Sequence, residues 1–114
     1  MRIVIAGVGA MGCLLGACLG SVADVALLGC WPEQLTALRR DGLRLEHPDG
    51  RVSHHALAVT GDVAAVGRAS IALVAVKSRQ TPAAAQTIAS LLSAGGLAVT
   101  LQNGLNNRAT LRAV

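Results

Sequence analysis

A strand that runs directly into a glycine-rich turn and then a helix is the feature of this sequence that most restricts its fold. Residues 2–6 form the predicted strand, and residues 13–19 form an apolar run typical of a helix. Between them the glycines fall at G-x-G-x-x-G spacing, at Gly7, Gly9 and Gly12. This order of strand, turn and helix is typical of sites that bind a dinucleotide diphosphate.

Each glycine of the turn has its own expected role. Gly7 allows the tight turn, Gly9 lets the backbone approach the phosphates, and Gly12 lets the helix lie close to the strand. The first N–H groups of the helix are unpaired and carry a partial positive charge, which attracts an anion. We therefore expect the cofactor-binding residues of the turn to be Gly7, Val8, Gly9, Ala10, Met11 and Gly12.

The same amino-terminal run allows a second interpretation. Residues 3–20 are apolar or small, Asp24 is the first acid, and the residues before Cys18 match the cleavage site of a lipoprotein signal. However, each glycine costs an isolated helix about 1 kcal/mol relative to alanine, and only Arg2 precedes the run. We therefore favour the dinucleotide interpretation, with a cytoplasmic location and no membrane partner, over an exported or membrane-anchored protein.

The composition agrees with one α/β domain. Of 114 residues, 53% are hydrophobic and 14% are charged, and the aromatic residues are a single Trp. The core must therefore consist of Ala, Val, Leu and Ile, which suits parallel strands that are buried on both faces. The low charge predicts packing against a further part of a larger protein or in a homo-oligomer.

Charge and cysteine content argue against several other functions. The net charge is +4, the basic residues are scattered, and aromatic platforms for bases are lacking, so we expect no nucleic-acid partner. Cys13, Cys18 and Cys30 lack the paired spacing of a metal site, so we expect no metal ion. We interpret all three as small buried hydrophobic residues in a reducing compartment.

The rest of the chain alternates between predicted strands and helices. Strands are expected at 23–28, 55–59, 70–76 and 97–101, helices at 32–40 and 81–93, and a hairpin at 43–54. We expect Gly95-Gly96 to end the second of these helices. The alternation predicts a parallel, doubly wound sheet.

Ligands of such sheets bind at the carboxyl ends of the strands. Besides the glycine turn, polar residues follow two predicted strands, at 77–81 and 102–104. Lys77 can donate to a ribose hydroxyl or a carboxylate, and Asn103 offers both a donor and an acceptor. On spacing alone, an ordinary solvated turn explains either segment equally well.

Taken together, these segments resemble the amino-terminal half of the ketopantoate reductase (2-dehydropantoate 2-reductase) family. The resemblance covers essentially the whole chain and rests on residues 7–29, 41–45, 76–78 and 101–105 in this order. It implies a Rossmann-like, doubly wound parallel α/β sheet. Members of the family use NADPH to reduce a 2-oxo acid to a 2-hydroxy acid in pantothenate biosynthesis.

The resemblance also implies roles for individual residues. Gly7 to Gly12 would hold the cofactor diphosphate, and Lys77 and Asn103 would contact the cofactor, with Asn103 also close to the substrate. The family commonly has an arginine directly after the glycine of the second strand, where it binds the 2′-phosphate of NADPH. Cys30 occupies that position here, so the expected cofactor is NADP(H) and NAD(H) stays open.

Three other residues bear on this choice. Trp31 either stacks on adenine or covers the sheet edge, and Arg39 and Arg40 are cations that can replace the missing arginine.

The family's general-acid lysine and its substrate-binding acid lie in a carboxy-terminal helical domain that this sequence lacks. We therefore assign no catalytic residue and expect residues 1–114 to be the dinucleotide-binding domain of a longer two-domain enzyme, inactive alone. Its expected partners are a nicotinamide dinucleotide and, in the full-length enzyme, a small 2-oxo acid. The alternative is a stand-alone, non-catalytic dinucleotide-binding module or redox sensor.

Overall fold

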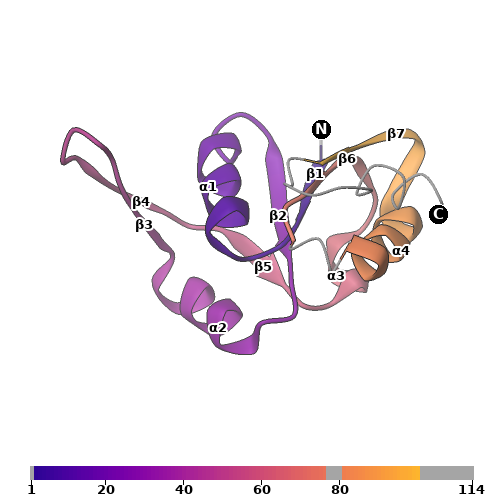
Figure 1. The fold of residues 1–114 in the computed structure, drawn as a ribbon, viewed down its shortest axis with the longest axis horizontal. Coiled ribbons are helices and arrows are strands. Elements are labelled where there is room, and N and C mark those ends of the chain that lie inside the picture. Colours follow the sequence, from indigo (N-terminus) through magenta and orange to yellow (C-terminus); the bar gives the residue numbers. More distant parts are fainter. Residues whose placement is uncertain (1, 77–80, 101–114) are drawn as a thin grey trace.

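Five parallel strands form the central sheet of this computed structural model, which describes residues 2–76 and 81–100 (Figure 1). The strands are β1 (Arg2–Ala6), β2 (Asp24–Leu28), β5 (Ala58–Thr60), β6 (Ala69–Val74) and β7 (Leu92–Thr100). Their order across the sheet is β5-β2-β1-β6-β7. The chain moves outward in one direction from β1 to β5 and in the other from β6 to β7. The junction of β1 and β6 is therefore the topological switch point, where such sheets bind their ligands.

Helices cover both faces of the sheet. They are α1 (Ala10–Leu19), α2 (Pro32–Asp41), α3 (Val63–Val66) and α4 (Thr81–Leu91). On one face, Ile3 and Ile5 of β1 share a core cluster with residues of α1 and α2. On the other face, Val4 and Ala6 share a cluster with residues of α3 and α4. Because both faces are covered, the central part of β1, β2 and β6 is a continuous apolar run rather than an alternating pattern.

A two-stranded antiparallel hairpin lies outside the sheet and extends away from the body of the domain (Figure 1). Its strands are β3 (Leu43–Glu46) and β4 (Val52–His55). The turn between them is closed by the His47 N–H, which donates to the Arg51 carbonyl at 2.8 Å. The hairpin predicted from the sequence is confirmed.

Other predicted boundaries differ from the structure. His55 belongs to the hairpin, and the third sheet strand begins only at Ala58. Helix α4 ends at Leu91 rather than at residue 93, and Gly95 and Gly96 lie within β7 instead of ending the helix. Leu92 pairs with Ala69, whereas Leu97 pairs with Ile71, so the glycines occupy an irregular, bulged part of this strand.

Two further findings concern α3 and the cysteines. The single turn of α3 has no counterpart in the sequence prediction, because four residues are too few to show a helical period.

Of the cysteines, only Cys13 is buried as expected, and Cys18 and Cys30 are exposed. Interpreting all three as buried residues was therefore wrong for two of them.

The apolar run of residues 3–20 is divided between β1, the glycine turn and the ten residues of α1. Within residues 2–76 and 81–100, no helix has the length and apolar content that crossing a membrane requires.

Candidate dinucleotide-binding site

The glycine turn lies at the carboxyl end of β1, next to the switch point. The Gly7 N–H donates to the Leu28 carbonyl at the end of β2, at 2.8 Å. On the other side, the Ala75 N–H donates to the Ala6 carbonyl at 2.9 Å. Helix α1 begins at Ala10, within the glycine motif and three residues before the predicted helical run. Neighbouring strands therefore hold both sides of the turn.

The fold itself requires two of the three glycines. Gly7 has a φ of +132°, a backbone angle that residues with a side chain rarely adopt. A Cβ there would also lie 3.0 Å from the Ala75 carbonyl. A Cβ on Gly12 would lie only 2.2 Å from the Gly7 carbonyl oxygen. The expected roles of Gly7 in the tight turn and of Gly12 in close helix packing agree with this geometry.

Gly9 differs from its two neighbours. Its φ is −79°, and a Cβ at this position would meet no heavy atom of the described residues within 4 Å. It is the N-cap residue of α1, no side chain caps this helix, and its first turn has no acid. The helix start is therefore open to an anion, and a side chain at Gly9 would occupy that open space.

The inner side of the turn is closely packed. Val8 is only 5% exposed, and its carbonyl oxygen accepts hydrogen bonds from Gln34 Nε2 at 2.9 Å and from Cys13 Sγ at 3.4 Å. Burial raises the pKa of the Cys13 thiol, and its hydrogen bond with Gln34 opposes this shift. The thiol therefore stays protonated and able to donate. Sequence analysis gave no role to Gln34, which is distant in the chain and belongs to no motif.

The residues after β2 are those expected to select the cofactor. Cys30 is exposed, and Trp31, the N-cap residue of α2, is 53% exposed. An aromatic face is thus accessible beside the carboxyl end of β2, which agrees better with stacking than with covering the sheet.

Arg39 and Arg40 both lie in the last turn of α2, away from Cys30 in the chain. Arg39 Nε donates to the Val59 carbonyl at 3.3 Å, whereas Arg40 binds the Asp41 carboxylate with a shortest contact of 3.0 Å. Arg40, but not Arg39, also lines a hollow of about 340 Å³ along α2. Its other lining residues are Pro32, Glu33, Thr36 and Ala37. The two arginines therefore have different partners, and both lie at the end of α2 that is distant from Cys30.

The other two predicted cofactor residues, Lys77 and Asn103, lie outside the described residues. Gly7, Val8, Gly9, Ala10, Met11 and Gly12 lie in the turn after β1 and in the first residues of α1.

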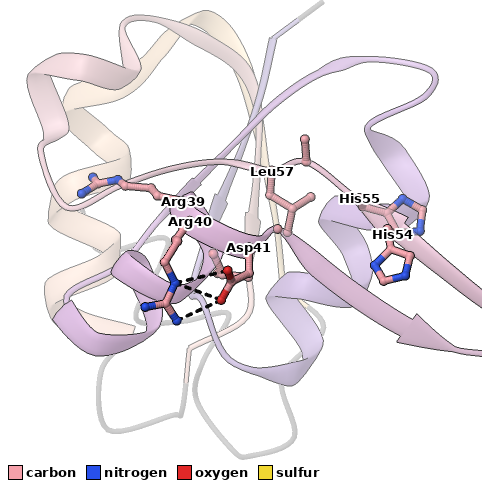
Figure 2. Close-up of a pocket in the computed structure, with 9 residues that line it drawn as sticks. Arg39, Arg40, Asp41, His54, His55 and Leu57 are labelled. Atoms are coloured by element: carbon pink, nitrogen blue, oxygen red, sulfur yellow. Dashed lines mark hydrogen bonds and ion pairs between the residues drawn. The ribbon is translucent and has the colours of Figure 1, made fainter.

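A second cavity, of about 330 Å³, lies between the end of α2 and the start of β5 (Figure 2). Its lining residues include Arg39, His54 and His55, as well as Arg40, whose guanidinium binds the Asp41 carboxylate. The strands are parallel, so the amino end of β5 lies at the opposite end of the strands from the glycine turn, which follows the carboxyl end of β1. This cavity is therefore separate from the candidate dinucleotide site.

The strand order and the glycine turn at the switch point define a Rossmann-like nucleotide-binding fold. The family model described as ketopantoate reductase PanE/ApbA matches residues 3–114. The chain belongs to this family.

Individual relatives agree with this assignment. A 2-dehydropantoate 2-reductase of Halobacterium salinarum is 41% identical over 112 residues, which cover 97% of this chain and 37% of the relative. The crystal structure of a PanE/ApbA family ketopantoate reductase from Ralstonia eutropha JMP134 is 34% identical, with a TM-score of 0.88, and the match covers 100% of this chain and 38% of that one.

A third relative is a D-mandelate dehydrogenase, whose ternary structure contains NADH and anilino(oxo)acetate. It is 26% identical, with a TM-score of 0.86, over 99% of this chain and 37% of that one. This chain therefore spans well under half the length of the relatives it matches. Their names are those of reductases and dehydrogenases, and nothing in them supports a non-catalytic module or redox sensor.

Proposed function

We propose that this chain is the NADP(H)-binding domain of a reductase that converts a small 2-oxo acid to a 2-hydroxy acid, as in 2-dehydropantoate 2-reductase. The observation that carries this proposal is the open, uncapped start of α1 at Gly9. Gly7 and Gly12 are explained by the fold, whereas no described atom explains the missing side chain at Gly9. We expect the diphosphate to occupy that space, beside the first N–H groups of α1.

In this proposal the chain binds and orients the cofactor. The turn from Gly7 to Gly12 holds the diphosphate, and Trp31 offers its ring to the adenine. By family resemblance, Lys77 and Asn103 contact the cofactor and Asn103 also lies close to the 2-oxo acid. When bound, the nicotinamide supplies the hydride for the reduction. We assign no catalytic residue within residues 1–114, and we infer that these residues alone bind the dinucleotide without turnover.

The preference between NADPH and NADH depends on the residues after β2. Cys30 offers no charge to a 2′-phosphate. Arg39 and Arg40 lie in the last turn of α2, away from Cys30, and Asp41 partly neutralises Arg40. We infer a weak preference for NADPH or near indifference between the two cofactors.

The test of the binding site is the substitution Gly9→Val. A branched side chain would occupy the space proposed for the diphosphate, and its Cβ would meet no described atom within 4 Å. We expect the variant to fold and its affinity for NADPH and NADH to fall at least tenfold, measured by calorimetric titration.

Ala89→Val is the matched control for this test, because Ala89 is exposed on α4 and α4 covers the other face of the sheet from α1. Its affinity should equal that of the natural sequence. Circular dichroism verifies that both variants are folded. A folded Gly9→Val protein that binds both cofactors normally would show that the turn is not the diphosphate site.

A further inference from the structure

The peptide between Val8 and Gly9 is fixed by a residue that is distant in the sequence. Gln34, in α2, is 26 residues beyond Val8, and its Nε2 donates to the Val8 carbonyl oxygen at 2.9 Å. The second donor to the same oxygen is Cys13 Sγ at 3.4 Å. A thiol is a weak donor, so the amide of Gln34 is the stronger of the two restraints.

The orientation of this carbonyl determines the orientation of a neighbouring donor. None of the described peptide bonds is cis, and in a planar trans peptide the C=O and the following N–H point in opposite directions. Since the Val8 carbonyl points inward to Gln34 and Cys13, the Gly9 N–H points outward from them. This N–H forms no hydrogen bond with any other described residue.

The turn would not hold this orientation by itself. The Val8–Gly9 peptide rotates about ψ of Val8 and φ of Gly9, and glycine has the widest choice of backbone conformations. The Val8–Gly9 peptide can therefore rotate at modest cost unless its carbonyl is bound. The hydrogen bond from Gln34 removes that freedom before any ligand arrives, which lowers the entropic cost of binding.

We propose that Gln34 is a positioning residue for the dinucleotide, which holds the Val8–Gly9 peptide so that the Gly9 N–H faces the cofactor diphosphate. This inference rests on the proposed function. Gln34 does not touch the cofactor in this arrangement but acts through the backbone of the turn. Its role requires a donor at Nε2 and not merely a side chain of this length.

Two substitutions separate the donor from the shape of the side chain. Gln34→Met keeps a similar length but cannot donate, and we expect about tenfold weaker binding of NADPH and NADH by calorimetry at pH 7. Gln34→Glu at pH 7 places an ionised carboxylate, which also cannot donate, beside the carbonyl, so its affinity should fall at least as far. Partial burial and the facing Val8 carbonyl oxygen favour the protonated carboxyl group, which can donate. The Gln34→Glu protein should therefore regain part of its affinity at pH 5 relative to Gln34→Met.

Gln86→Met is the matched control, because Gln86 is exposed on α4 and takes no part in the turn. It should bind both cofactors like the natural sequence. Unchanged affinity in a folded Gln34→Met protein would overturn the inference. Failure of the natural sequence to bind either cofactor would instead contradict the proposed function, so the two failures are distinguishable.

Discussion

The glycine turn and the β3–β4 hairpin are both tight connections, but they are held in different ways. The turn is bound from outside by β2, through the Leu28 carbonyl, and by α2, through Gln34. The hairpin is bound mainly to itself. Its strands pair from Leu43 with His55 to Glu46 with Val52, and neither strand joins the main sheet (Figure 1).

The side chains show the same difference. In the hairpin, the Ser53 hydroxyl lies between two imidazoles, 2.8 Å from His47 Nε2 and 2.9 Å from His55 Nε2, and all three belong to this one segment. In the turn, Val8 contacts residues of α1 and α2. A substitution in a connection that several elements hold should affect the core and the bound ligand. A substitution in a connection that its own residues hold should have only local effects.

The largest expected effect is that of Gly12→Ala. The added Cβ would lie 2.2 Å from the oxygen and 2.9 Å from the carbon of the Gly7 carbonyl, so α1 must move away from the turn. We expect the free energy of unfolding to fall by about 3 kcal/mol, the upper range for overpacking a core. Urea denaturation measures this change.

Gly50→Ala in the hairpin turn is the control for that substitution. A Cβ there would meet nothing within 4 Å, but the φ of +86° still disfavours alanine, by about 1 kcal/mol. Equal destabilisation by the two substitutions would contradict the proposed contrast between the turn and the hairpin.

The next effect concerns cofactor choice beside the turn. Cys30→Arg restores a cation directly after β2, and a charged hydrogen bond of this kind contributes about 1.5–3 kcal/mol. We expect the ratio of dissociation constants for NADH and NADPH to rise about tenfold or more, since 1.4 kcal/mol is a factor of ten.

Cys18→Arg offers a matched control, because Cys18 is also exposed but lies on α1. It should leave the ratio unchanged. A strong preference for NADPH in the natural sequence that Cys30→Arg does not alter would show that another residue binds the 2′-phosphate.

Much of the fold follows from local patterns in the sequence. The runs that become β1, β2 and β6 are apolar and bounded by turns, and the hairpin has a polar turn between two short strands. The end of α4 could not be predicted, because a Gly-Gly pair such as Gly95-Gly96 commonly ends a helix. Here the two glycines lie in a bulge of β7, which forms only when β7 pairs with β6. Likewise, nothing local indicates that His55 stays in the hairpin.

The part of the candidate site that is continuous in the sequence could be predicted. Gly7 to Gly12 form a motif whose spacing has a direct physical meaning. The restraint by Gln34 is a contact between distant segments, and it appears only when α2 packs beside the turn. For the same reason, the sequence offered Arg39 and Arg40 as equivalent cations, whereas the structure directs Arg39 to Val59.

The smallest expected effect is that of Ser53→Ala in the hairpin. It removes the hydroxyl between His47 and His55, which are only partly buried and can exchange these hydrogen bonds for water. We therefore expect the free energy of unfolding to fall by no more than about 1 kcal/mol, measured by urea denaturation. Because the hairpin is held by its own residues, the dissociation constants for NADPH and NADH should stay within twofold of those of the natural sequence. A loss of affinity as large as that expected for Gln34→Met would show that the hairpin and the glycine turn are coupled, and the contrast between locally and remotely held connections would then fail.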